Sequence, residues 1–197
     1  MTYALTPVEK LSPGGPARVR EIYESGFAEH LRAPWAEAGS DRLASEESLA
    51  LTDDGTPVGF VLLRSFVTTD RVFLRYLVID ADRRGQGLGS IAWQHLRRHC
   101  VREDFSVLVW DVEHPEEPGT DATEVTTRRK RIGFYERLGG VVLPVDDYTT
   151  PHGEPDDAHE APMLLMATSL DDSALPVHDA AWVDGVVRDV NRHRWGR

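Results

Sequence analysis

The sequence predicts an α/β (α+β) fold in which helices flank a mixed, mostly antiparallel sheet of about six to seven strands. Two observations support this prediction. Residues 48–52 and 57–67 form a predicted hairpin, because an Asp-Gly pair between two strand-like runs is a strong turn signal. The run Val72–Ile79, rich in β-branched and aromatic residues, then leads through a glycine-rich turn into a helical pattern. Three successive antiparallel strands therefore lead into one helix.

The remaining elements are predicted from periodicity and from turn signals. Further strands are expected at 3–11, 106–112, 141–145 and 163–168, and helices at 17–27, 124–139 and 180–190. The helix at 124–139 ends at a Gly-Gly pair, which is a usual C-terminal stop. The segment Asp146–Pro162 contains six acidic residues and three prolines, so it is interpreted as an extended acidic loop.

The C-terminal segment differs from the rest of the chain. Residues 171–176 form a predicted linker, and the helix that follows has apolar residues at helical spacing. We therefore expect one domain over residues 1–170, followed by a linker and an amphipathic helix over 171–197. That helix either docks on the sheet or forms a contact in a homodimer.

The bulk composition is ordinary for a globular protein. The 197 residues are 41% hydrophobic and 28% charged, enough to bury a sizeable core. No apolar run approaches the ~20 residues that cross a bilayer, and the N-terminus lacks the basic and apolar regions of a signal peptide. The single cysteine, Cys100, excludes an internal disulfide and fits a reducing compartment. We therefore expect a cytoplasmic protein with no membrane partner.

The charge distribution indicates an anionic ligand but not nucleic acid. The formal net charge is −11, whereas a nucleic-acid partner requires basic surface. Against this acidic background, arginines gather around the glycine-rich turn and its helix, and a second basic run occupies 128–131. Two basic islands near a phosphate-binding turn suit an anionic cofactor.

The turn Arg83–Ser90 has the pattern of a phosphate-binding loop. Its three glycines allow the backbone to approach a ligand where a Cβ would clash. The N–H groups lie at a helix N-terminus, which favours an anion, and two arginines add positive charge. The spacing matches neither the dinucleotide fingerprint nor a Walker A loop.

Two motifs resemble those of the GNAT acyltransferase superfamily. The run Arg84–Gly89 is similar to its pyrophosphate-binding motif, Gln/Arg-x-x-Gly-x-Gly/Ala, and Phe134–Gly139 is similar to its Phe-Tyr-x-x-x-Gly segment. The resemblance implies a GNAT fold, with acetyl-CoA or another acyl-CoA as cofactor. It also implies that a bulged strand before the turn offers its backbone to the pantetheine arm. The implied cofactor-binding residues are Leu77, Val78, Ile79, Arg84, Gly85, Gln86, Gly87, Leu88, Gly89 and Ser90.

The resemblance also suggests the catalytic groups. Tyr135 occupies the position of a tyrosine that protonates the departing thiolate in many members. The usual glutamate is missing from the strand 72–79, which offers Arg75 instead. Asp111 and Glu113 are two apart on the next strand and point to one side. The resemblance implies that this strand faces the acyl-transfer cleft, so Glu113, acting through a water or directly, is our preferred base; His114 is an alternative. A second departure is Arg128, where the family often has an asparagine that contacts the cofactor.

We therefore expect an N-acetyltransferase that moves an acetyl group from acetyl-CoA to a primary amine of a small molecule or a protein. The alternative is a GNAT-fold module that binds acyl-CoA or a partner without catalysis. Carboxylates of the acidic segment would attract a cationic amine, although a solvated loop is the simpler interpretation. The spacing of His152 and His159 matches no standard metal site, so no metal is predicted.

Overall fold

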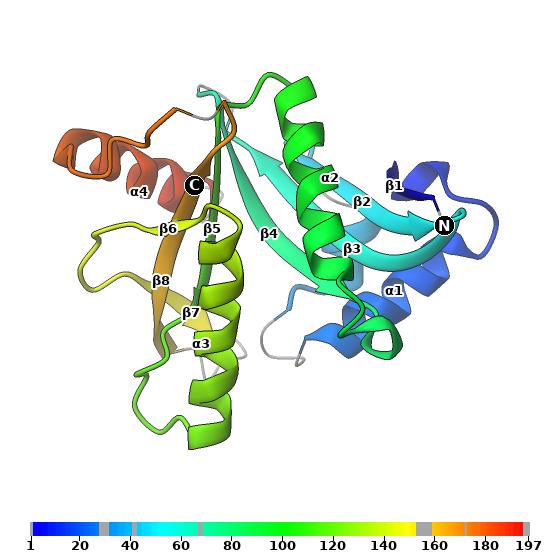
Figure 1. Cartoon of the computed structure of the whole chain (residues 1–197), viewed down its shortest axis with the longest axis horizontal. Coiled ribbons are helices and arrows are strands. Elements are labelled where there is room, and N and C mark those ends of the chain that lie inside the picture. Colours follow the sequence, from blue (N-terminus) through cyan, green and yellow to red (C-terminus); the bar gives the residue numbers. More distant parts are fainter. Residues whose placement is uncertain are drawn as a thin grey trace.

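The computed structural model describes residues 2–27, 32–40, 43–66, 69–152, 159–171 and 173–194. Strands and helices follow one another along the chain, with short helical turns between some of them (Figure 1). The elements are β1 (Tyr3–Pro7), α1 (Gly15–Gly26), β2 (Glu46–Asp53), β3 (Thr56–Ser65), β4 (Arg71–Ile79), α2 (Leu88–Arg102), β5 (Val107–Glu113), α3 (Ala122–Arg137), β6 (Val141–Val142), β7 (Thr149–His152), β8 (His159–Ser169) and α4 (Ala180–Arg194).

The strands form one mixed sheet of eight strands. Its order is β1-β2-β3-β4-β5-β8-β6, and β7 pairs with β8 beside this path. The pairing of β4 with β5 is parallel, and the other recorded pairings are antiparallel. The predicted class, a mostly antiparallel mixed sheet with flanking helices and a further C-terminal helix, is confirmed.

The two halves of the sheet separate between β4 and β5. These strands pair only where Arg71–Phe73 meets Val107–Val109, and beyond that point they diverge (Figure 1). In the pairing of β3 with β4, Leu62 lies opposite Tyr76 and Leu63 lies opposite Leu74. Arg75 is thus the extra residue of a β-bulge, which bends the strand and increases its twist. The sheet therefore opens next to Arg75.

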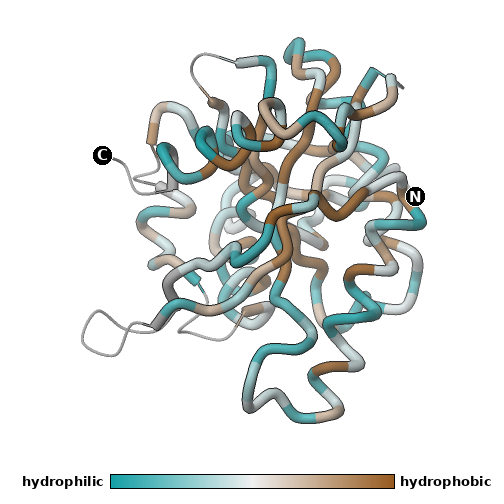
Figure 2. The backbone as a smooth tube through the Cα atoms, turned by 90° about the vertical axis from the view of Figure 1, so that its left-hand side faces the viewer, coloured by the Kyte–Doolittle hydropathy of each residue, from teal (hydrophilic) through white to brown (hydrophobic). Residues whose placement is uncertain are grey.

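Helices cover both faces of the sheet. Trp93 of α2 and Tyr135 of α3 belong to one core cluster, so these two helices share a face. On the opposite face, Ile22 of α1 packs in a second cluster and Val186 of α4 in a third. Hydrophobic residues concentrate on the inner strands, and hydrophilic ones on the outer loops and helix surfaces (Figure 2). None of the described helices is long and apolar enough to cross a membrane.

Local hydrogen bonds set where the later helices begin. The Asp121 side chain accepts from the backbone N–H groups of Thr123 and Glu124 at 2.8 and 2.9 Å, so α3 starts at Ala122. This start lies two residues before the predicted one. Asp179 caps α4 in the same way, accepting from the N–H of Ala181 at 2.9 Å. An aspartate cap satisfies donors that have no partner within the helix.

Two regions differ from the sequence-based prediction. The segment Asp146–Pro162 is not simply a loop: Thr149–His152 forms β7, paired in register with the first residues of β8. Its residues 153–158 lie outside the described part of the chain. The first strand ends at Pro7, because the chain turns into a short 3-10 helix at Val8–Lys10. Local composition specifies neither the partner with which a strand pairs nor the residue at which the chain turns.

The C-terminal helix packs on the sheet. Val186 and Val190 are buried against Phe73, Val109 and Leu165. The Arg71 guanidinium pairs with Asp189 at 2.6 Å, which ties α4 to the start of β4. Of the two predicted roles for this helix, docking on the sheet is the one observed. The division at residue 170 remains a prediction, as does the homodimer.

Replacing Val186 with alanine tests this docking. Val186 is fully buried, so Val186→Ala removes two buried methyl groups and leaves a cavity. We expect a loss of about 2 kcal/mol in the free energy of unfolding, measured by urea denaturation. The matched control is Val101→Ala, because Val101 is 49% exposed on α2; its unfolding free energy should change by less than about 0.5 kcal/mol. Equal effects of both variants would contradict the docking.

Candidate active site

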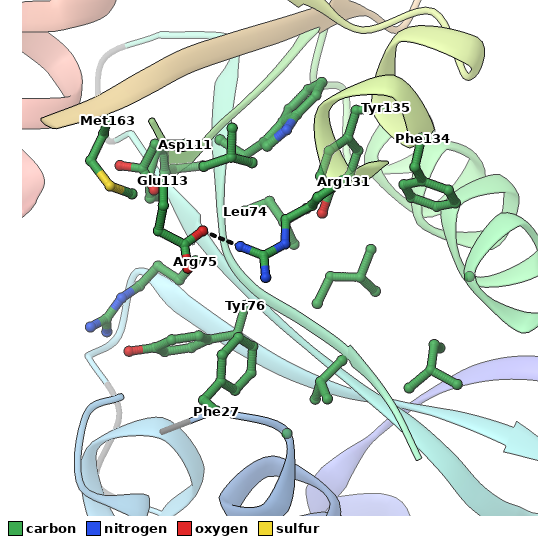
Figure 3. A pocket seen from close by; sticks show the side chains of 18 of the residues that line it. Phe27, Leu74, Arg75, Tyr76, Asp111, Glu113, Arg131, Phe134, Tyr135 and Met163 are labelled. Carbon is green, nitrogen blue, oxygen red and sulfur yellow. Dashed lines mark hydrogen bonds and ion pairs between the residues drawn. The ribbon is translucent and has the colours of Figure 1, made fainter. Parts of the chain in front are cut away.

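A cavity of about 1050 Å³ occupies the opening between β4 and β5. Residues of both sheet faces line it, including Leu74 and Trp110 from the α2 face and Phe27 and Tyr76 from the α1 face. Side chains from β4, β5 and α3 point toward its centre (Figure 3). The cavity thus connects the two faces through the sheet.

The glycine-rich turn forms one end of this cavity. Gly85 and Gly87 have φ angles of +75° and +79°, a region that other residues rarely adopt. Gly87 is the N-cap of α2, so the first N–H groups of the helix, at Leu88 and Gly89, have no partner within it. These donors and the helix dipole favour an anion at this end. All the predicted residues Arg84–Ser90 line the cavity except Gln86.

Side-chain bonds hold the turn in place. The Gln86 amide oxygen accepts from Arg83 Nε at 3.2 Å, and Arg83 also pairs with Asp53 at 2.8 Å. Arg84 donates from Nε to the carbonyl oxygen of Ile79 at 3.2 Å. Gln86 therefore stabilises the turn through its side chain. The contact of Gln86 with the cofactor remains a prediction.

The predicted backbone platform also lies on the cavity. Leu77, Val78 and Ile79 line it, and their other edge pairs with β3 through Phe60 and neighbouring residues. Because β5 has already diverged, the edge of β4 that faces the opening is available to an extended ligand. The strand and the glycine turn thus border the same cavity.

Tyr135 lies at the centre of an aromatic cluster beside the cavity. Its ring centroid is 4.9 Å from that of Trp110 and 5.2 Å from that of Trp93. The hydroxyl points into the cavity (Figure 3). The pKa of Tyr135 is raised to about 12, mainly by burial; the Arg131 charge acts to lower it and the Glu113 carboxylate acts to raise it. At neutral pH the phenol is therefore protonated and available as a hydrogen-bond donor.

Glu113 and Asp111 both line the cavity, as their two-residue spacing predicts. Glu113 forms an ion pair with Arg131 of α3 (Figure 3). Burial tends to raise the pKa of Glu113, but the positive charge and hydrogen bond of Arg131 outweigh it, and the pKa is lowered. Asp111 accepts a hydrogen bond from the Tyr148 hydroxyl at 3.0 Å. The sequence shows Arg131 only as part of the basic run 128–131 and does not predict its pairing with Glu113; Arg131 is one α-helical turn before Tyr135.

Two other candidates lie away from the cavity. His114 is not among the lining residues, and its Nδ1 accepts from the backbone N–H of Glu116 at 3.1 Å. Arg128 is absent from the lining as well. Its guanidinium pairs with Glu117 at 2.6 Å and with Glu124 at 3.1 Å. Arg128 therefore anchors the loop before α3.

Cys100 is a structural residue of α2. It is fully buried in the core. Burial, with the charge of Glu47, raises the pKa of its thiol to about 12. A buried thiol that stays protonated is not a nucleophile.

A buried ionic cluster at the far end of the cavity was not predicted. Glu46 of β2 is only 2% exposed at its side chain and pairs with Arg64 at 2.7 Å and Arg75 at 2.6 Å. Burial tends to raise the pKa of Glu46, but the two guanidinium groups lower it overall. The three residues come from three different strands. No spacing within the sequence indicates that they meet.

Replacing Glu113 tests the Arg131 ion pair through its pH dependence. Because the folded pKa lies below the usual 4.5, the pair stabilises the fold above pH 4.5 and loses this effect as pH falls through the folded value. We expect Glu113→Gln to lower the free energy of unfolding by about 2 kcal/mol at neutral pH. The difference from wild type should shrink in acid. A difference that stays constant from neutral to acidic pH in urea titrations would contradict the ion pair.

Comparisons with known proteins agree with this architecture. A family model described as the acetyltransferase (GNAT) family matches residues 17–139, well over half of the chain. Among solved structures, a GNAT-family protein from Bacteroides thetaiotaomicron has a TM-score of 0.74 and 19% identity, covering 100% of this chain and 99% of that one. A GNAT acetyltransferase from Elizabethkingia anophelis, solved with acetyl-CoA bound, has a TM-score of 0.55 and 12% identity, covering 85% and 97%.

A curated relative is similar over a shorter stretch. The mitochondrial N-acetylglutamate synthase of Danio rerio is 26% identical over 93 residues, which is 47% of this chain and 16% of that protein. The chain thus spans a small part of that relative. The family model covers both the glycine-rich turn and the Tyr135 segment. The chain therefore belongs to the GNAT family of acetyltransferases, transferases that use acetyl-CoA.

Proposed function

We propose that this protein is an N-acetyltransferase that moves an acetyl group from acetyl-CoA to a primary amine of a small molecule or a protein. The observation that carries the proposal is the cavity itself. It brings the glycine turn, the open edge of β4 and the Tyr135 hydroxyl together at the opening of the sheet. An anionic group of the ligand would meet the glycine turn, and an extended arm with amide groups would meet the edge of β4. A reactive thioester would then lie at the Tyr135 hydroxyl.

The glycine turn and β4 are the proposed donor site. N–H groups at Gly85, Gly87 and Gly89, with the Arg84 guanidinium, suit the pyrophosphate of acetyl-CoA. The backbone of Leu77–Ile79 suits the amides of the pantetheine arm, which would extend the sheet as an added strand. The acetyl-CoA bound to the Elizabethkingia anophelis neighbour supports acetyl-CoA as the donor.

Tyr135 is the proposed general acid. An amine that attacks the thioester releases a thiolate, which must gain a proton. The burial that raises the pKa of Tyr135 to about 12 makes the phenol a weak acid but keeps it fully protonated. The hydroxyl therefore acts first as a hydrogen-bond donor that stabilises charge on sulfur, and completes the proton transfer as the thiol leaves.

Glu113 is the proposed base for the acceptor amine. It lines the cavity and is ionised at neutral pH, because Arg131 lowers its pKa. The same pairing lowers its basicity, so the proton transfer is best relayed through a water. Asp111, on the same strand and also lining the cavity, is the second candidate.

The proposal also includes an amine as the acceptor and the cytoplasm as the location of the protein. The curated relative is named as an N-acetylglutamate synthase, which supports an amine as the acceptor. We also propose a cytoplasmic location, because Cys100 is a free thiol and acetyl-CoA is available there.

Replacing Arg84 tests the donor site. Arg84→Gln removes the guanidinium from the turn while leaving the backbone N–H groups, so acetyl-CoA should bind about tenfold more weakly in calorimetric titration. The matched control is Arg20→Gln, because Arg20 is 56% exposed on α1 and pairs with Glu24; its affinity should match wild type. If the wild-type protein bound no acyl-CoA at all, the donor site would be refuted. Binding without turnover on any amine would indicate the non-catalytic module.

Replacing Tyr135 tests the general acid. Tyr135→Phe keeps the packing against both tryptophans but removes the proton donor, so kcat should fall about 100-fold or more. The affinity for acetyl-CoA should stay within about threefold of wild type. Thiol release measures the rate, and calorimetry measures the affinity. Tyr23→Phe is the control, because it removes a buried hydroxyl that bonds to the Ala33 carbonyl outside the cavity lining. A Tyr135→Phe enzyme with wild-type kcat would remove the proposed acid.

A further inference from the structure

The cavity has a second end, opposite the glycine turn, that the donor does not use. Arg75, Tyr76, Asp111 and Met163 gather there, on the other side of Tyr135 from Phe134 (Figure 3). We call these four residues the acceptor end. The donor occupies the glycine turn and the β4 edge, so the amine reaches the thioester from this end.

The bulge in β4 directs Arg75 to the acceptor end. Leu74 pairs with Leu63 and Tyr76 pairs with Leu62, so Arg75 has no opposite residue in the ladder and interrupts the alternation of side chains. Its guanidinium carbon lies 5.4 Å from the centre of the Tyr76 ring. Stacking on an aromatic face fixes the plane of an arginine and leaves its edge for hydrogen bonds.

Two guanidinium groups bind the Glu46 carboxylate. The Glu46 Oε1 atom accepts from Arg64 Nε at 3.0 Å, from Arg64 Nη2 at 2.7 Å and from Arg75 Nη1 at 2.6 Å. Two guanidinium groups thus share one carboxylate among these three residues. Arg64 donates two of these hydrogen bonds and Arg75 donates the third, so Arg75 is the second guanidinium group at this carboxylate.

Arg75 differs from Arg64 in its exposure. Both line the cavity, but the Arg75 side chain is 21% exposed whereas that of Arg64 is 9% exposed. A partly desolvated arginine held by one hydrogen bond and one stacked ring retains further N–H donors in a planar fork. That fork fits a carboxylate bidentately, and reduced solvent strengthens the interaction.

We propose that the acceptor is a small amine that carries a carboxylate, bound by the Arg75 guanidinium with Glu46 and Arg64 positioning it. This inference rests on the proposed acetyl transfer and names its substrate class. The carboxylate anchors the acceptor at the far end of the cavity. The amine then points back toward Glu113, which lies between Arg75 and Tyr135 in Figure 3, and toward the thioester of the bound donor.

Paired amines test the inference on the wild-type enzyme. γ-Aminobutyrate and butylamine share a chain length and have similar amine basicity, but only the first carries a carboxylate. The same comparison extends to a series of ω-amino carboxylates and to the common α-amino acids, each beside an amine without the carboxylate. With saturating acetyl-CoA, we expect kcat/KM to be at least about tenfold higher for the best carboxylate-bearing amine than for its partner.

A substitution at Arg75 assigns the preference to this residue. Arg75→Gln should lower kcat/KM for the carboxylate-bearing amine about 10- to 100-fold, mainly through KM, and leave its carboxylate-free partner unchanged. Arg75→Lys should restore part of the loss, because it returns the charge without the fork. Calorimetry should give wild-type affinity for acetyl-CoA in both variants. The matched control is Arg129→Gln, because Arg129 is 63% exposed on α3.

Three outcomes would overturn the inference while leaving the acetyltransferase intact. One is that carboxylate-free amines react as well as their partners. Another is that Arg75→Gln slows both members of a pair equally, which would indicate a structural role only. The third is that acetyl-CoA binds but no carboxylate-bearing amine reacts or binds. Failure of acetyl-CoA binding in the wild-type protein would instead refute the proposed function itself.

Discussion

The separation of β4 from β5 is the constraint on which the site depends. The two strands pair over three residues and then diverge, and the bulge at Arg75 bends β4 at that point. Divergence leaves the backbone of Leu77–Ile79 without a neighbouring strand on one side, and it creates a passage between the two faces of the sheet. A sheet paired along its whole length would satisfy these backbone groups and close the passage.

The packing on each face holds the opening in place. Trp93, Trp110 and Tyr135 form a closely packed aromatic group that connects α2, β5 and α3 on one face. On the other face, α4 packs across β5 and β8 and is joined to β4 by the ion pair of Arg71 with Asp189. Each of these two cores contains residues of both β4 and β5, so the packing on each face holds the two halves of the sheet on either side of the opening.

Ion pairs between elements set the charge of the cavity. Glu113 is matched by Arg131, and Glu46 is matched by Arg64, so two carboxylates at the site are already neutralised. Several arginines of the two basic islands bond to other parts of the protein and not to the cavity. Arg128 pairs with Glu117 and Glu124. Arg97 donates to the Thr168 hydroxyl and to the Ser169 carbonyl. A basic run in the sequence therefore does not by itself identify the arginines that line the cavity.

The sequence by itself determined the features that rest on local chemistry. Gly85 and Gly87 require the left-handed region, and a glycine-rich turn between a strand and a helix exposes N–H groups whatever surrounds it. The two-residue spacing of Asp111 and Glu113 likewise places both on one side of a strand. Only the tertiary structure decided the groupings that join distant segments: the bulge at Arg75, the pairing of β7 with β8, and the arginines beside Glu46 and Glu113. These depend on register and on contacts between strands and helices, which no local pattern specifies, because each partner is chosen by packing across the sheet.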